Sequence, residues 1–329
     1  MKATLKNGAA AAEAVGPSQT RKILPGLLWL LLMAGLTGCS IKQFAVNKVG
    51  DALASGGTTF ASDEDPELIR QAVPFSLKLM ESLLAESPRH KGLLFATASG
   101  FTQYAYAFVQ QDADELEDQD FAAAEAMRAR ARRLYLRARD YGLRGLEARH
   151  PGIGSALRAN PTNAVRVVAK RDVPLLYWTA VSWAAAISLS KDDPQRIAEV
   201  PQAEALIDRA AALDPDWDRG SIHSFLITYE MVRQGAAGDA AQRSRRHFER
   251  AVELSGGKLA GPYVSFAEAV SVQKQDLAEF DALLARAQAI NPDDQPETRL
   301  VNLVMQRRAR WLLSKRDELF LIPESTPSQ

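Results

Sequence analysis

The 329-residue chain contains one cysteine, Cys39, so no disulfide bond can form within it and its stability must come from packing. It also lacks any convincing alternation of apolar and polar residues, which argues against a β-sheet. No glycine-rich phosphate loop or GxSxG nucleophile motif is present, and the four histidines are far apart, with no HxxxH pair. These absences predict an all-α protein that is not an enzyme and that has no cofactor and no metal site.

Cys39 ends a run of residues that is typical of a secretory signal with a lipoprotein box. A basic pair at residues 21–22 precedes the apolar residues 23–34, and Leu-Thr-Gly at 36–38 leads directly into Cys39. The alternative is a membrane-spanning helix, but a span needs roughly 20 apolar residues and this stretch has about a dozen. We therefore expect residues 1–38 to be a cleaved signal peptide and Cys39 to become an acylated N-terminal residue.

Acylation of Cys39 would place the mature protein in the periplasm, anchored to a lipid membrane. Ser40 follows Cys39 at a position where an aspartate would resemble an inner-membrane retention signal, so the outer membrane is favoured. Removal of the signal peptide takes away four basic residues and one acidic residue, which leaves 36 basic and 39 acidic side chains. A slightly acidic chain has no global field that attracts nucleic acid, and we expect no nucleic-acid partner.

Helical periodicity extends over almost all of the remaining sequence. We expect residues 39–61 to be a tether near the lipid, residues 62–320 to form one helical domain and residues 321–329 to be a flexible tail. Apolar residues recur every three or four positions from Pro66 onward. The helix expected at 172–190 is apolar on nearly every face, which is typical of a helix at the centre of a fold.

An internal repeat places small or apolar residues at offsets 0, 4 and 7 of a helix, with proline or glycine at offset 12. This pattern makes one helix face that a neighbour can approach closely, and the proline ends the helix. It is the second-helix half of a tetratricopeptide (TPR) repeat, although the first-helix signature is poor. We predict a compact single domain of TPR-like stacked helical hairpins, an α-solenoid. The repeat residues are Ala203, Ile207, Ala210 and Pro215; Ser244, Phe248, Ala251 and Gly256; Phe280, Leu284, Ala287 and Pro292; and, in a degenerate copy, Ser76, Met80, Leu83 and Pro88.

Four stretches, at residues 72–81, 175–183, 203–217 and 247–257, together resemble the T component of TRAP transporters (the TatT family). The resemblance covers nearly all of residues 66–320. It implies a TPR-like periplasmic lipoprotein that works beside a TRAP solute-binding protein, assembles as a homotrimer and helps to deliver a small organic ligand. The alternative is a TPR-like scaffold lipoprotein of envelope assembly that has no small-molecule ligand.

Aromatic residues at helical spacing are the candidate ligand contacts, because ligand pockets are mostly apolar with a few polar groups. The competing interpretation is that these rings simply fill the core, as aromatics at helical spacing usually do. The resemblance favours a binding role for Tyr177 and Trp178 in particular. The candidates are Tyr104, Tyr177, Trp178, Trp183, Phe225 and Tyr229.

Two charged segments have less specific interpretations. The acidic run at residues 112–120 is typical of a solvated loop, with partner docking as the alternative. The aspartates at 214, 216 and 218 suggest a calcium loop, but Arg219 and Phe225 stand where an EF-hand requires glycine and glutamate. Calcium binding is therefore disfavoured.

Overall fold

The computed structural model describes residues 47–52 and 57–321. The predicted signal peptide, the acylated Cys39, part of the tether and residues 322–329 lie outside the described residues, so the predictions about them stay predictions. The described residues form helices and no strand, which confirms the all-α class. Among these residues, no helix combines the length and the apolar character needed to cross a bilayer.

Residues 47–52 are helical, and the numbered elements follow from residue 57. The α-helices are α2 (Gly57–Ala61), α3 (Pro66–Glu86), α4 (Lys91–Ala105), α5 (Gln111–Leu116), α6 (Phe121–Arg149), α7 (Ile153–Ala159), α8 (Pro161–Ala164), α9 (Val173–Ser188), α10 (Pro194–Ile197), α11 (Val200–Leu213), α12 (Trp217–Tyr229), α13 (Ala240–Leu254), α14 (Ala260–Phe266), α15 (Leu277–Gln288), α16 (Arg299–Ser314) and α17 (Arg316–Leu319). Two π-helical turns are η2 (Tyr106–Gln110) and η5 (Ala267–Ser271), and the 3₁₀ turns are η3 (Val165–Val167), η4 (Lys170–Asp172), η6 (Pro292–Asp294) and η7 (Pro296–Thr298).

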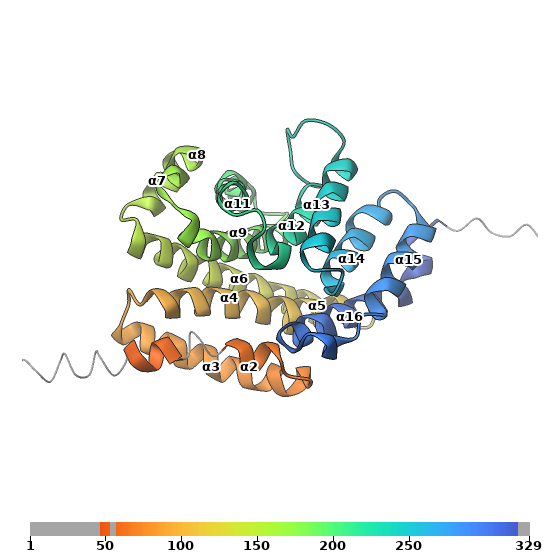
Figure 1. Ribbon diagram of the computed structural model, residues 1–329, viewed down its shortest axis with the longest axis horizontal. Coiled ribbons are helices and arrows are strands. Elements are labelled where there is room, and N and C mark those ends of the chain that lie inside the picture. The colour runs from red at the N-terminus through yellow and green to blue at the C-terminus, as the bar shows by residue number, and fades with distance from the viewer. Residues whose placement is uncertain (1–46, 53–56, 322–329) are drawn as a thin grey trace, which may run out of the picture. The chain divides into compact units, whose positions relative to one another are not determined.

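Helices α3, α4, α6, α9 and α11 pack one against the next in chain order (Figure 1). Helix α9 lies between α6 and α11 and also touches α4, so it is covered on several sides. Leu176 and Ala180 of α9 are completely buried in a core cluster that extends to Leu206 and Ile222. The prediction that this apolar helix lies at the centre of the fold is confirmed.

The α6–α9 contact depends on glycine. A Cβ atom added at Gly142 of α6 would lie 2.2 Å from Thr179 Oγ1, and one at Gly145 would lie 2.7 Å from a methyl carbon of Leu175. Both distances are shorter than van der Waals contact, so only glycine lets the two backbones approach this closely. This geometry positions α9 against α6 by shape alone.

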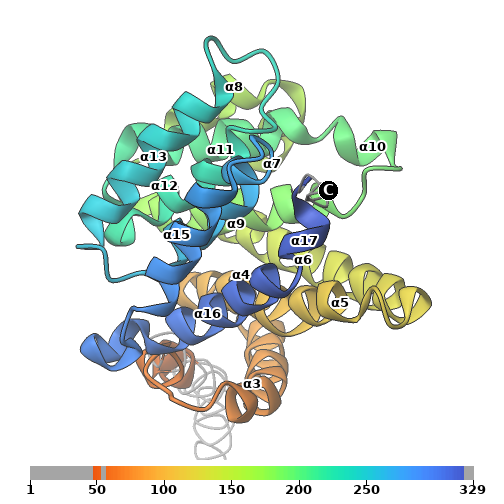
Figure 2. The same cartoon turned by 90° about the vertical axis from the view of Figure 1, so that its right-hand side faces the viewer.

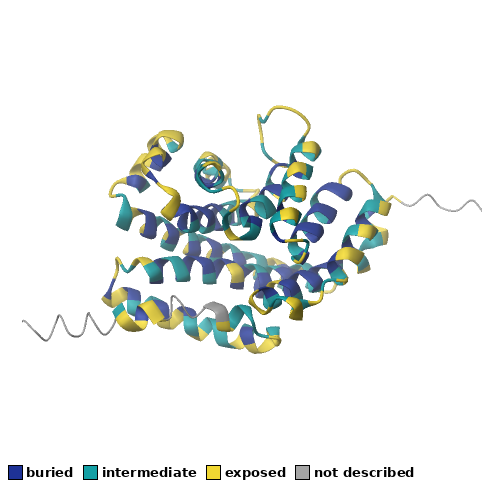
Figure 3. Ribbon diagram, viewed as in Figure 1, coloured by how far each residue is buried: buried dark blue, intermediate teal, exposed yellow. Residues whose placement is uncertain are grey.

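The repeat positions form the buried faces of α11, α13 and α15 (Figure 3). The helices α12, α13, α14, α15 and α16 again pack on their neighbours in chain order. Pro215, Gly256 and Pro292 each follow the end of a repeat helix, as expected. Stacked TPR-like hairpins are therefore confirmed, and the described residues from Asn47 to Leu321 form one compact unit.

The succession of helix contacts returns to its beginning, because α16 packs against α2 and α3 (Figure 2). Arg299 Nη1 of α16 donates a hydrogen bond to the backbone oxygen of Ser62 at 2.7 Å. Further along α16, Arg307 and Arg308 form ion pairs with acidic residues of α5. The last long helix thus joins elements that are about 200 residues away in the sequence.

The prediction of a solvated loop at residues 112–120 is wrong for the first part of this segment. Helix α4 continues through the π-helical turn η2 into α5, and the first part of the acidic run is helical as far as Leu116. Its carboxylates are half-buried rather than solvated, because Asp112 is paired with Arg70 and Arg307, and Asp114 with Arg128 and Arg308. The partners come from helices that are distant in the sequence, so the acidic run alone did not reveal them.

Candidate functional site

Five of the six aromatic candidates gather around one core cluster. Tyr177, Trp178 and Trp183 lie on α9, Phe225 and Tyr229 lie on α12, and all five pack on the cluster around Leu176 and Leu206. Tyr104 does not join them, because it lies on α4 in a second cluster, with its ring 5.7 Å from that of Phe108. We call the five rings on α9 and α12 the aromatic set.

Within the aromatic set, four of the five rings form two pairs, and Trp183 belongs to neither. The Tyr177 ring centre lies 5.0 Å from that of Trp178 and 5.0 Å from that of Trp217, and burial raises the pKa of Tyr177. Phe225 and Tyr229 are stacked with their ring centres 5.4 Å apart. These separations are typical of favourable aromatic packing, which contributes to stability with or without a ligand.

Exposure separates the members that could meet a ligand from those that could not. Tyr177 and Trp183 are buried, and Trp183 Nε1 donates a hydrogen bond to Glu199 Oε2 at 2.7 Å. Trp178, Phe225 and Tyr229 are partly exposed, and the Tyr229 hydroxyl donates to Glu204 at 2.9 Å. Neither of the two hollows described below is lined by any of the six candidates. Ligand binding by the aromatic set stays a prediction.

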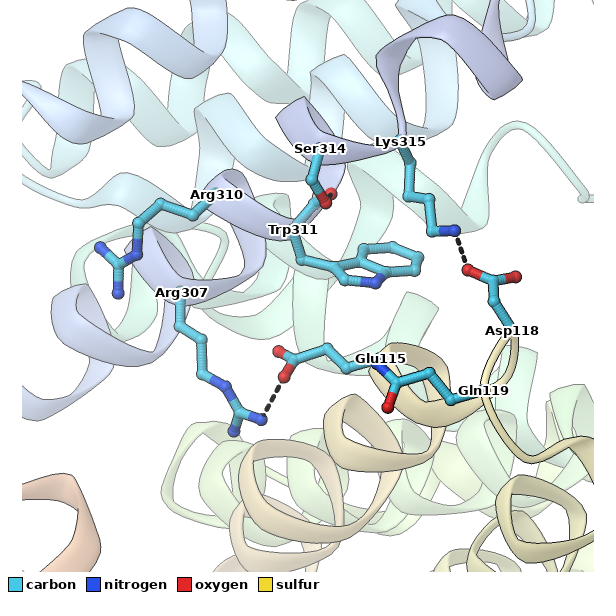
Figure 4. A pocket seen from close by; sticks show the side chains of 8 residues that line it. All are labelled: Glu115, Asp118, Gln119, Arg307, Arg310, Trp311, Ser314 and Lys315. Atoms are coloured by element: carbon cyan, nitrogen blue, oxygen red, sulfur yellow. Dashed lines mark hydrogen bonds and ion pairs between the residues drawn. The ribbon is translucent and has the colours of Figure 1, made fainter.

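A polar groove of about 540 Å³ lies between α5 and α16 (Figure 4). Trp311 stands at its centre, between an ion pair of Lys315 with Asp118 and an ion pair of Arg307 with Glu115 at 2.6 Å. We call this hollow the α16 groove. Its lining residues are Glu115, Asp118, Gln119, Arg307, Arg310, Trp311, Ser314 and Lys315.

Charge in the α16 groove is almost balanced. Burial would lower the pKa of Arg307, but the carboxylates of Glu115 and Asp112 outweigh it and raise the pKa. Arg310 is exposed, extends away from both ion pairs in Figure 4, and has no hydrogen-bond or ion-pair partner within residues 47–52 and 57–321. The lining of the groove therefore includes one uncompensated positive charge, that of Arg310, whereas the guanidinium over the Trp311 ring is that of Arg308, 4.1 Å from the ring centre. Sequence analysis missed this site, although Arg307-Arg308-Ala309-Arg310-Trp311 is a dense basic segment.

A second hollow of about 210 Å³ lies where α4 meets the start of α9, and Arg149 and Leu175 are part of its lining. Arg149 Nη1 donates to Asp172 Oδ1 at 2.9 Å, and the Asp172 side chain is completely buried. Burial would raise the pKa of Asp172, but the Ala169 N–H, His150 and Arg149 outweigh it and lower the pKa. This carboxylate therefore acts as a structural link between the end of α6 and the start of α9.

The aspartates considered for calcium each have a different partner. Asp214 pairs with Lys170, Asp216 with Arg250, and Asp218 accepts a hydrogen bond from Ser221. Across the part of the chain that the structure describes, no three His, Cys, Asp or Glu side chains converge as metal ligands would.

Two histidines that are separate in the sequence come together in the fold. His223 Nδ1 of α12 and His247 Nδ1 of α13 are 2.8 Å apart, so one ring donates and the other accepts. Burial, together with the neighbouring His223, lowers the pKa of His247 to about 4. The pair is therefore neutral near pH 7 and joins α12 to α13 as a structural contact.

Comparison with known proteins agrees with the fold. The model of the TRAP transporter T-component family matches residues 62–320, and the chain therefore belongs to that family. A protein of Treponema pallidum (strain Nichols), described as uncharacterized, is 28% identical over 302 residues, which cover 86% of this chain and 94% of that relative. Membership identifies the chain as an accessory component of TRAP transporters.

Proposed function

We propose that the mature chain is a lipid-anchored periplasmic T component that binds a TRAP-type solute-binding protein and a small organic ligand. The observation that carries the proposal is the family match over residues 62–320. The fold is consistent with it, because stacked helical hairpins present extended surfaces for partners. Binding rather than catalysis is its role in this proposal.

Anchoring depends on acylation of Cys39, which would hold the protein on the periplasmic side of a membrane, preferentially the outer one. Full-length protein expressed with its own signal should sediment with membranes and carry lipid on mass spectrometry. The Cys39→Ser variant should appear in the soluble periplasmic fraction. Retention of Cys39→Ser in the membrane pellet would contradict the lipoprotein assignment.

The α16 groove is the surface that we assign to the solute-binding protein. Its support is that the exposed Arg310 and the indole of Trp311 both line this groove, since arginine and tryptophan are enriched at the energetic centres of protein interfaces. The experiment is co-purification of tagged chain with a TRAP-type solute-binding protein from the same organism. Arg310→Glu should weaken capture at least tenfold, whereas reversing the exposed Arg158 on α7 should not. Equal capture by both variants would place the interface elsewhere.

Self-association as a homotrimer is supported by an apolar stripe on α3. Leu68, Phe75 and Leu79 follow one another at spacings of seven and four, and they are 55%, 73% and 36% exposed. Sedimentation of wild-type protein should give a trimer, and Phe75→Ser should give a monomer. Val232→Ser, which changes a 63% exposed valine after α12, is the matched control and should leave the trimer intact.

Ligand contact is assigned to the exposed edge of the aromatic set. Trp178 is the sharpest test, because it is partly exposed and its ring meets Tyr177 edge-on. Trp178→Phe keeps an aromatic ring, so the melting temperature should be nearly unchanged while uptake of the solute falls. A variant with normal uptake would assign Trp178 to the core alone.

A further inference from the structure

A second polar cluster lies inside the fold, between α5, η5 and α16. It consists of Tyr106, Gln111, Asp114, Glu268 and Arg308, and we call it the Tyr106 cluster. Two of its members come from π-helical turns, since Tyr106 begins η2 and Glu268 lies in η5. Such turns are rare and often occur at functional sites, because the extra residue redirects a side chain.

Gln111 has an amide that the protein leaves unused. Its side chain belongs to a residue that is only 1% exposed, and neither Nε2 nor Oε1 makes a hydrogen bond of normal geometry among residues 47–52 and 57–321, although the amide lies close enough to the Tyr106 hydroxyl to lower the pKa of that tyrosine. Most buried polar side-chain atoms in proteins are hydrogen-bonded, so two open atoms on one amide require an explanation. The simplest is that another molecule supplies the missing donor and acceptor.

Tyr106 adds a third group with unused capacity. Its hydroxyl lies 3.7 Å from the sulfur of Met305, which is a weak acceptor. Burial and the negative charge of Glu268 raise the pKa of Tyr106 to about 12, and Arg308 and the adjacent Gln111 offset this only in part. The phenol is therefore protonated near pH 7 and can both donate and accept.

Charge in the cluster disfavours an anionic guest. Arg308 is inserted between two carboxylates, with Nη1 2.8 Å from Asp114 Oδ2 and Nε 3.3 Å from Glu268 Oε2. Its positive charge is compensated twice, so no free cation of the cluster can meet a carboxylate. A carboxylate brought to Gln111 would instead face the negative charges of Asp114 and Glu268.

Exposure decreases from one side of the cluster to the other. The Glu268 side chain is 37% exposed and that of Arg308 is 9% exposed, while Gln111 is almost completely buried. The side of the cluster that meets solvent is therefore the side of Glu268.

We propose that the Tyr106 cluster binds the polar end of a small uncharged organic molecule, with a primary carboxamide as the best-fitting group. The Gln111 amide presents a donor and an acceptor side by side, which pair reciprocally with another carboxamide. The Tyr106 hydroxyl supplies a further hydrogen bond to the ligand. The ion pairs of Arg308 with Asp114 and Glu268 hold α16 against α5 and η5 around the cluster. This inference rests on the proposed role in solute uptake and adds to it a second ligand site, separate from the aromatic set, with a stated ligand class.

The test compares hexanamide with hexanoate, two probes of equal chain length that differ in the charge of the polar end. Purified wild-type protein should bind hexanamide at least tenfold more tightly than hexanoate in ligand-detected NMR titrations. Gln111→Met, which keeps the length of the side chain but removes the amide, should weaken hexanamide binding at least tenfold. Gln195→Met on α10 is the matched control and should bind as wild type does, because this glutamine is exposed.

Tyr106→Phe removes only one hydroxyl and provides a second variant if Gln111→Met does not fold. It should weaken hexanamide binding about threefold to tenfold, as expected for one lost hydrogen bond. Equal binding of the two probes, unchanged binding by Gln111→Met or Tyr106→Phe, or no hexanamide binding at all would overturn the proposal. The last result would mean that ordered water alone occupies the cluster.

The proposed function can fail separately from this site. Capture of the solute-binding protein reports on the TRAP role, whereas hexanamide titration needs no partner. A chain that binds hexanamide but captures no solute-binding protein would support the Tyr106 site and contradict the transport assignment. A chain that captures the solute-binding protein but does not bind hexanamide would contradict the Tyr106 site alone.

Discussion

The α6–α9 contact and the α5–α16 contact hold the fold together by different physical means. Gly142 and Gly145 let α6 and α9 approach at distances that admit no additional atom. The α5–α16 contact is made by ion pairs of Arg307 and Arg308 with acidic residues of α5, and it is extended by the ion pair of Lys315, just after α16, with Asp118 in the turn after α5. The first contact is specified by shape and tolerates no change in volume. The second is specified by charge and encloses polar atoms that have no partner.

The two contacts also differ in what they contribute to stability. Dry packing of buried apolar side chains contributes about 25 cal/mol for each Å² removed from water. Ion pairs that keep partial exposure, as Arg307 with Glu115 does at 30% for each side chain, contribute only about 0 to 1 kcal/mol. The α5–α16 contact is therefore the weaker of the two. It is also the one that lies beside the α16 groove and the Tyr106 cluster.

The largest expected effect is at the shape-specified contact. Gly142→Val should lower the free energy of unfolding by about 3 kcal/mol, because its Cβ alone would overlap Thr179. Urea denaturation monitored by circular dichroism measures the change. Gly154→Ala on α7 is the control: its Cβ would lie 3.5 Å from Glu147, and the effect should stay within about 1 kcal/mol. Similar losses in both variants would show that the α6–α9 approach is not the cause.

At the charge-specified contact, Arg308→Met should lower the free energy of unfolding by about 2 to 3 kcal/mol. Removal of one partner from a buried pair leaves carboxylates uncompensated, and the value is below the usual loss because Glu268 stays partly solvated. The matched control is Arg310→Met, which removes an exposed and unpaired arginine from the same helix. Its unfolding curve should overlay that of wild type, and an equal loss in the control would assign the effect to helix propensity.

The fold was predictable where the determinants are local. Helical period reports which face is buried, so residues such as Ala203, Ile207 and Ala210 indicated the face of α11 that packs on its neighbours. The apolar character of α9 likewise indicated its central position. Both predictions depend on residues within a single helix.

The binding regions depend on distant residues, and for that reason sequence analysis did not find them. The acidic run was interpreted as a loop because Arg70 and Arg307, the partners of Asp112, lie 42 and 195 positions away. The π-helical turn that begins at Tyr106 carries no composition signal. The aromatic candidates were recognised as apolar, but their exposure depends on α9 and α12 together.

Acidic pH should weaken the α5–α16 contact more than the α6–α9 contact, because only the former depends on ionised carboxylates. Burial would raise the pKa of Asp112, but hydrogen bonds from Arg70 and Arg307 outweigh it and hold the pKa below 3.8. Since the folded state lowers this pKa, the stabilisation is complete well above pH 3.8 and is lost as the pH falls through the folded value. Asp112→Asn should lower the free energy of unfolding by about 1.5 kcal/mol at pH 7. The difference from wild type should shrink toward pH 3.

Amide hydrogen exchange can show which helices are destabilised at acidic pH. Amides of α16 should lose protection between pH 5 and pH 3, after correction for intrinsic exchange, while those of α9 keep theirs. Asp317→Asn is the control, because Asp317 is 84% exposed and its replacement should change stability by less than about 0.5 kcal/mol at either pH. A uniform loss of protection in α9 and α16 would show that the two contacts do not differ in this way.

The smallest expected effect is an increase in stability, whereas the substitutions above decrease it. Gln111→Met should raise the free energy of unfolding of the ligand-free protein by about 1 kcal/mol, because it removes buried amide atoms that have no partner and keeps the volume of the side chain. A mutation that stabilises the fold while it abolishes hexanamide binding would show that the α5–α16 contact gives up stability in order to bind. Destabilisation by Gln111→Met would mean that water already satisfies this amide, since its loss would then remove hydrogen bonds that the ligand-free protein makes.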